Sequence, residues 1–136
     1  MEIHVDQVQG KVPVTVMRVH GEIDRTNYEA LIEHSQKAYE SGARNILLDL
    51  SQVPYMSSAG LVAMQRIIRV LNGEGIPTEE DGWSALRGLD KLRQGEKQPN
   101  FKLLSPQPSV YNSLDTVGFT ELIDVYNDEK EAVASF

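Results

Sequence analysis

The segment at residues 45–68 constrains the fold more than any other part of the chain. It begins with Ile-Leu-Leu-Asp-Leu at 46–50, a short and almost entirely apolar run that is typical of a strand buried on both faces. The residues at 51–54, which end in a proline, terminate that strand. Side chains then recur on one face of a helix predicted at 59–71: Leu61, Met64, Gln65, Ile68 and Leu71. A strand leading straight into a helix places the intervening Ser57 and Ser58 at the carboxyl end of an α/β sheet, where functional groups gather.

The rest of the chain continues this alternation of strands and helices. Val12, Val14 and Val16 alternate with other residues and predict a strand at 12–19, paired as a hairpin with a first strand at 3–8. The remaining elements are expected in this order: helix 27–40, strand 46–50, helix 59–71, an insertion at about 76–100, strand 101–104, a helix around 110–119, strand 121–125 and a helix from 128. We therefore predict a single α/β domain over residues 1–136, with a mixed sheet of four or five strands covered by helices.

The composition excludes several classes of protein. The length of 136 residues suits one domain, and the absence of cysteine rules out disulfides and fits a reducing cytosol. The first residues, Met-Glu-Ile-His-Val, lack the features of a signal peptide, and no apolar run approaches the roughly 20 residues of a membrane helix. A net charge of −7 argues against a nucleic-acid partner. We therefore expect a cytoplasmic protein that binds neither membrane nor nucleic acid.

No set of catalytic residues emerges from the sequence. His4, His20 and His34 fall on two predicted strands and one helix, without the spacing of metal ligands. There is no phosphate-binding G-x-x-x-x-G-K-[ST] loop and no G-x-S-x-G turn around any serine. We therefore expect no enzymatic activity, no cofactor and no metal site.

The insertion at about 76–100 precedes the penultimate strand and is expected to contain a short helix. Leu86, Leu89 and Leu92 are spaced for that helix, and the single tryptophan, Trp83, lies at its start. Trp83 either packs the insertion onto the domain or forms a contact with a partner or a second copy, since tryptophan is enriched at interface hot spots.

Two short motifs carry a resemblance to a known family. The run D-L-S-Q-V-P-Y-M-S-S-A-G-L at 49–61 resembles the signature of the STAS domain, and in particular that of bacterial anti-sigma factor antagonists (anti-anti-sigma factors). The tetrad G-E-I-D at 21–24 is similar to a second motif of the same family. Ser57 stands where many members have Asp, and Ala59 where many have Ser or Thr. The resemblance covers nearly the whole chain outside the insertion.

The resemblance implies a protein-binding module that is switched by phosphorylation. Ser58 would be the phosphoacceptor, and Asp24 would lie beside its loop. The expected docking face comprises Asp24, Ser57, Ser58 and Gly60, with Val62 at its edge. The implied partners are an anti-sigma factor with serine kinase activity, which binds the unphosphorylated protein, and a serine phosphatase that restores binding.

Other interpretations of these residues remain open at this stage. From spacing alone, Ser58 is the N-cap of its helix, worth about 1 kcal/mol, and Asp24 or Thr26 caps the preceding helix. A phosphoryl group on Ser58 would use the same helix terminus, where backbone N–H groups attract an anion. The alternative function is a STAS module that is not phosphorylated and acts as a scaffold or a small-ligand sensor. A weak homodimer is compatible with either function.

Overall fold

The computed structural model describes residues 1–73 and 97–136. The predicted insertion, with its helix and Trp83, lies outside the described residues except for 97–100. None of the described helices is long and apolar enough to span a membrane.

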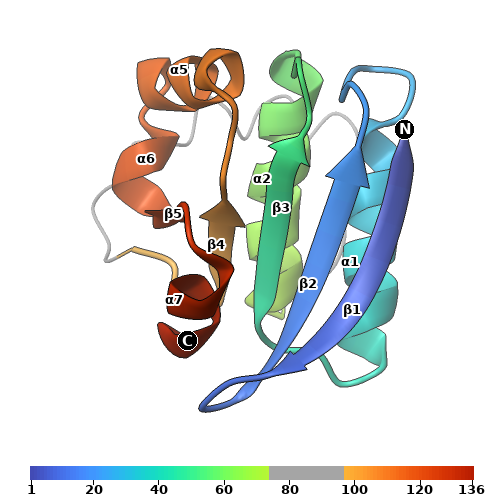
Figure 1. The fold of residues 1–136 in the computed structure, drawn as a ribbon. Coiled ribbons are helices and arrows are strands. Elements are labelled where there is room, and N and C mark those ends of the chain that lie inside the picture. The colour runs from blue at the N-terminus through green and yellow to red at the C-terminus, as the bar shows by residue number, and fades with distance from the viewer. Residues whose placement is uncertain (74–96) are drawn as a thin grey trace.

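A five-stranded mixed sheet forms the centre of the molecule, in the order β1-β2-β3-β4-β5 (Figure 1). The strands are β1 (Glu2–Gln9), β2 (Pro13–His20), β3 (Ile46–Gln52), β4 (Phe101–Leu104) and β5 (Val125–Tyr126). The first two pair as an antiparallel hairpin, and all later neighbours are parallel. This arrangement confirms the prediction of a mixed α/β sheet. Because β2, β3 and β4 are parallel, their carboxyl ends lie together at one end of the sheet.

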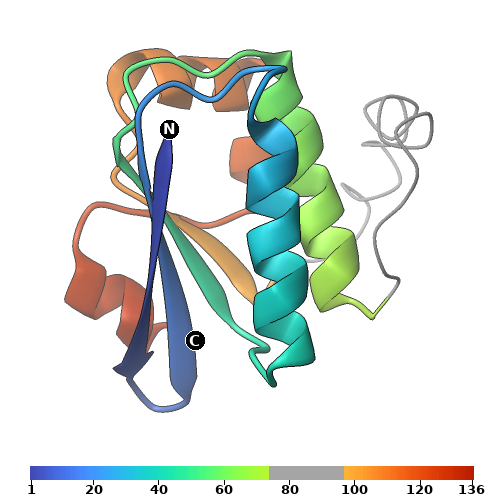
Figure 2. The same ribbon diagram turned by 90° about the vertical axis from the view of Figure 1, so that its right-hand side faces the viewer.

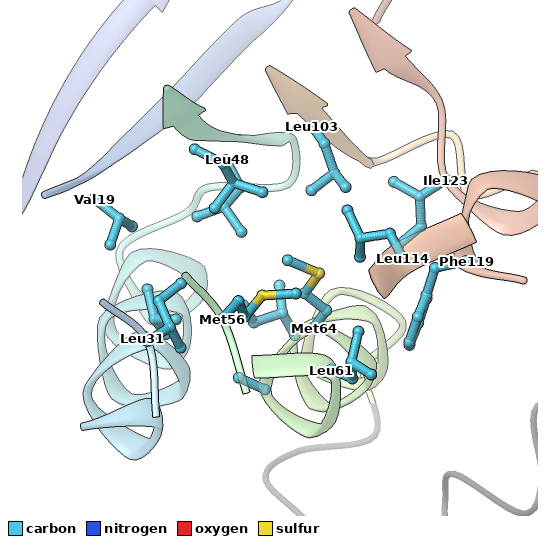
Figure 3. Packing of buried hydrophobic residues seen from close by; sticks show 14 of the residues in the cluster. Val19, Leu31, Leu48, Met56, Leu61, Met64, Leu103, Leu114, Phe119 and Ile123 are labelled. Carbon is cyan, nitrogen blue, oxygen red and sulfur yellow. The ribbon is translucent and has the colours of Figure 1, made fainter. Parts of the chain in front are cut away.

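Helices cover both faces of the sheet (Figure 2). They are α1 (Tyr28–Glu40), α2 (Ser58–Leu71), α5 (Pro108–Thr116), α6 (Phe119–Leu122) and α7 (Glu129–Ala134). The larger core lies against α1 and α2, where Leu31, Met64 and Leu48 point toward one another (Figure 3). The smaller core lies on the other face, where Ala132 and Val133 of α7 cover the sheet. Because both faces are covered, the apolar run of β3 is buried, as its sequence predicts.

The last strand is shorter than predicted and begins later. The sequence predicts a strand at 121–125, but residues Phe119–Leu122 form α6 and only Val125–Tyr126 form β5. Gly118 adopts φ +84°, a left-handed conformation that starts a new turn of helix. Phe119 and Leu122 then share one face at helical spacing and are both buried. The predicted order of elements was therefore wrong in this region, where two helices precede the strand.

An ion-pair network joins four elements on the α7 side of the sheet. Arg18 of β2 donates from Nε to Asp6 Oδ2 of β1 at 2.8 Å, and from Nη1 to Asp49 Oδ2 of β3 at 3.3 Å. The same Nη1 donates to Glu129 Oε1 of α7 at 2.6 Å. The hydrogen bond to Glu129, followed by that to Asp6, raises the pKa of the Arg18 guanidinium above its ordinary value. Arg18 thus fixes α7 and the hairpin to the central strand.

Replacing this arginine tests the network. We predict that Arg18→Met lowers the free energy of unfolding by about 2 kcal/mol, because the buried Asp49 carboxylate loses its cation. The matched control is Lys97→Met, which breaks the exposed pair of Lys97 with Asp124 and is expected to change stability by less than about 1 kcal/mol. Urea unfolding of both variants measures the difference, and equal effects would contradict a structural role for the network.

Candidate functional site

The loops that follow the parallel strands β2 and β3 are joined by backbone hydrogen bonds at the carboxyl ends of these strands. Gly21 N donates to Gln52 O at 3.0 Å, and Ile23 N donates to Tyr55 O at 3.1 Å. Ser57 N returns a bond to Ile23 O at 2.9 Å, and Ile23 forms an isolated parallel bridge with Met56. The β2–α1 loop that carries Asp24 and the β3–α2 loop that carries Ser57 therefore form one rigid unit.

A third loop, between β4 and α5, packs on the same unit. Gln107 Nε2 donates to Ser51 O at 3.0 Å, and Ser109 Oγ donates to Pro54 O at 3.0 Å. These side chains satisfy the carbonyl group of Ser51 near the end of β3 and that of Pro54 in the β3–α2 loop. Three loops from three parallel strands thus surround the start of α2, as expected for functional sites in open α/β sheets.

The two adjacent serines have different roles. Ser57 is the N-cap of α2, and its hydroxyl accepts a hydrogen bond from Ala59 N at 3.2 Å. Ser58 is the first residue of the helix, and its side chain is exposed. In the part of the chain that the structure describes, the Ser58 hydroxyl has no hydrogen-bond partner. The interpretation of Ser58 as the cap was therefore wrong, because the cap lies one residue earlier.

Asp24 is held in a tight turn before α1. The hydroxyl of Thr26 donates to Asp24 Oδ1 at 2.6 Å, and the backbone N–H of Thr26 donates to the same oxygen at 2.8 Å. These two bonds lower the pKa of the Asp24 carboxyl below its ordinary value, and the bond from the Thr26 hydroxyl has the larger effect. The N-cap of α1 is Asn27, so neither Asp24 nor Thr26 caps that helix as the sequence suggested. Asp24 instead presents a fixed negative charge next to the paired loops.

Gly60 and Val62 do not lie on an exposed docking face, contrary to the sequence prediction. Val62 is completely buried in the larger core, because α2 is buried on nearly all sides. Gly60 is also buried, and a Cβ atom there would overlap the side chain of Met56 and approach Ile23 Cγ2 to 3.3 Å. The glycine therefore lets the helix pack closely under the paired loops, while the surface itself is formed by other residues.

Tyr55 is an exposed residue of this site that the sequence analysis did not single out. The residue is 54% exposed and lies two positions before the N-cap Ser57. Its backbone is fixed by the bond from Ile23 N, so the ring projects from a rigid loop. Burial of an aromatic side chain in a partner is favourable when little conformational entropy is lost. The sequence carried no sign of this exposure, because Tyr55 lies among the apolar residues Val53, Pro54 and Met56.

The site can accept a charged group but shows no catalytic constellation. Among residues 1–73 and 97–136, no three His, Asp or Glu side chains are placed to hold a metal ion. The exposed Ser58 hydroxyl lies at the start of a helix, where backbone N–H groups and the helix dipole stabilise an anion. Of the residues predicted for the site, the structure brings together Asp24, Ser57 and Ser58.

Known structures share this fold. The chain is similar to a Thermotoga maritima protein assigned as an anti-sigma factor antagonist, with a TM-score of 0.69 and 18% identity over 96% of this chain and 90% of that one. It is also similar to the anti-sigma factor antagonist SpoIIAA in its unphosphorylated form, with a TM-score of 0.67 and 19% identity over 97% and 93% of the two chains. For Bacillus SpoIIAA in the phosphorylated form the TM-score is 0.60, with 18% identity over 97% and 96%.

No curated protein matches the chain, but a family model does. The model of the STAS domain matches residues 6–78, which include the second half of β1, all of β2, both paired loops and α2. This match covers more than half of the 136 residues, and the fold agrees with it. The chain therefore belongs to the STAS domain family.

Proposed function

We propose that this protein is an anti-sigma factor antagonist whose binding is switched by phosphorylation of Ser58. Unphosphorylated, it binds an anti-sigma factor and so frees a sigma factor in the cytoplasm. The observation that carries the proposal is that the two serines have different roles. Ser57 caps α2, so the exposed Ser58 hydroxyl is not needed as the cap. The solved forms of SpoIIAA, one unphosphorylated and one phosphorylated, support a switch of this kind.

The proposed surface combines one aromatic anchor with a fixed charge. Tyr55 supplies exposed apolar area, and Asp24 supplies a carboxylate that is ionised at neutral pH and whose pKa Thr26 lowers further. Such a surface suits a partner that offers an apolar pocket and a basic group beside it. Ser58 lies three residues after Tyr55, within the same contact area.

Phosphorylation would end binding without unfolding the protein. A phosphoserine adds nearly two negative charges and considerable bulk to the surface. The start of α2 tolerates these charges, because the helix dipole and unpaired N–H groups favour an anion there. The partner surface, however, would face the added bulk and the cost of desolvating the phosphate. We further propose that the anti-sigma factor is itself the serine kinase, and that a serine phosphatase removes the group.

One observation favours the alternative of a small-ligand sensor. A cavity of about 590 Å³ lies between the β1–β2 hairpin and the C-terminal end of α1, away from the Ser58 loop. Its lining includes the basic side chains His34, Lys37 and Arg44 together with the apolar Val5 and Pro13, and no carboxylate. A small anion with an apolar body would match this lining. Ligand binding there would not require Ser58 to be modified.

The roles of the two serines can be separated by stability. We predict that Ser57→Ala lowers the free energy of unfolding by about 1 kcal/mol, because the Ala59 N–H loses its cap. Ser58→Ala serves as the matched control and should change it by less than about 0.5 kcal/mol, as for other exposed positions. Urea unfolding measures both values. A larger loss for Ser58→Ala than for Ser57→Ala would show that the hydroxyl of Ser58 is structural.

The switch itself is tested with a mimic of the phosphorylated state. We predict that Ser58→Asp lowers affinity for the partner at least about tenfold, whereas Ser58→Ala retains it. Wild type and both variants are used as baits in lysate of the source organism, and the bound proteins are identified by mass spectrometry. Affinities are then measured by titration calorimetry with the captured partner.

The control for added charge is Ser41→Asp, at the exposed C-cap of α1 and the opposite end of the sheet. This variant should bind like wild type. If Ser58→Asp and wild type hold the same proteins with the same affinity, Ser58 is not the switch. If Ser58→Ala loses the partner while still folded, the hydroxyl itself is a contact and the assignment is also wrong.

A further inference from the structure

The two edges of the sheet are built very differently. β5 ends one side with two residues, Val125–Tyr126, and α7 lies close to it. β1 ends the other side with eight residues, Glu2–Gln9, and extends along the outside of the molecule (Figure 1). Within the described residues, β1 pairs with β2 alone, so the outward half of its backbone N–H and C=O groups faces solvent.

β1 has few of the features by which natural proteins protect an exposed edge. Such strands are kept short, or carry charged side chains (especially lysine), proline or a bulge that prevents further pairing. β1 contains neither lysine nor proline, and of its two carboxylates Asp6 is already paired with Arg18 of the same chain. Its pairing with β2 runs without interruption from Glu2 opposite His20 to Gln9 opposite Pro13. At its middle, the aliphatic Val5 is 43% exposed.

We propose that this edge binds a second copy of the chain, with the two β1 strands pairing antiparallel to join the sheets. The backbone limits the alignment, because successive residues direct their hydrogen-bonding groups alternately inward and outward. Residues that pair across the twofold axis must therefore both be odd-numbered or both be even-numbered. One residue at the axis then lies directly opposite the same residue of the other copy, and the alignment is centred on it.

Charge selects among the remaining alignments. Centring on Asp6 would set two like carboxylates directly opposite each other, and centring on His4 would set Glu2 against Asp6. Centring on Val5 places the two Val5 side chains together and sets His4 of each copy opposite Asp6 of the other. Asp6 also accepts a hydrogen bond from Arg18 Nε of β2 at 2.8 Å, which fixes its carboxylate on the α7 side of the sheet. The alignment on Val5 thus pairs the longest stretch of β1, Glu2–Val8, that sets no like charges opposite each other.

The proposed dimer leaves the Ser58 loops free. A twofold axis through Val5 reverses the strand direction from one copy to the other, so the carboxyl ends of their parallel strands lie at opposite ends of the joined sheet. Both copies would keep α1 and α2 on the same face. Dimerisation is therefore independent of the proposed binding of an anti-sigma factor. Since only one strand from each copy pairs, the dimer belongs with small, weak interfaces.

The test compares two lysine variants by sedimentation equilibrium over a range of protein concentrations. Wild type should show a reversible monomer–dimer equilibrium. Val5→Lys should weaken it at least about tenfold, because two lysines would meet at the axis. Asn112→Lys makes the same change of charge on the exposed face of α5 and should dimerise like wild type. A wild type that stays monomeric at about 1 mM, or a Val5→Lys variant that dimerises normally, overturns the proposal.

A second variant keeps the proposal testable if Val5→Lys fails to fold. The chain has no cysteine, so Val5→Cys introduces its only thiol. Across the proposed axis the two Cβ atoms lie about 4.5–5.5 Å apart, close enough for a disulfide after a small adjustment. Mild oxidation should link most Val5→Cys chains into dimers and leave the matched Asn112→Cys variant largely monomeric. Equal cross-linking of both variants would show random collision and refute the edge interface.

Discussion

The arrangement of the site depends on one short piece of backbone pairing, the bridge between Ile23 and Met56. The bonds from Ile23 N to Tyr55 O and from Ser57 N to Ile23 O fix where the β3–α2 loop ends. Helix α2 therefore begins at Ser58, with Ser57 as its cap. The glycine at position 60 permits this close approach, since any Cβ there would overlap Met56. Exposure of the Ser58 hydroxyl is a consequence of this pairing.

The rest of the fold holds that pairing in place. β2 and β3 are neighbouring parallel strands, so the loops that follow them emerge side by side. Helices α1 and α2 bury one face of these strands, and α7 with the Arg18 network secures the other. Tyr55 and Asp24 are thus displayed on a rigid frame, which lowers the entropy lost on binding a partner. A switch by added charge and bulk suits such a frame, because no element has to move.

Much of the architecture follows from local sequence patterns, and the exceptions have physical reasons. The apolar run of β3 and the helical spacing after it predicted the strand, the loop and α2 correctly. Spacing could not decide between two adjacent serines as the cap, because that choice depends on the bridge to Ile23, a contact between distant segments. Val62 was placed at the edge of the docking face on the family resemblance alone, whereas α2 is buried on nearly all sides. α6 was missed because its start depends on the left-handed conformation of Gly118. Tyr55 carried no periodic signal, and its exposure is a property of the folded loop.

The most direct test of the central claim, that Ser57 caps the helix and Ser58 accepts the phosphoryl group, is to map the modification itself. The purified protein would be incubated with ATP and the partner captured from lysate, digested, and analysed by tandem mass spectrometry. The account predicts a phosphoryl group on Ser58 and none on Ser57, with Ser57→Ala still modified at Ser58. Modification of Ser57, of a serine outside the three loops, or of no serine by an active kinase would contradict it.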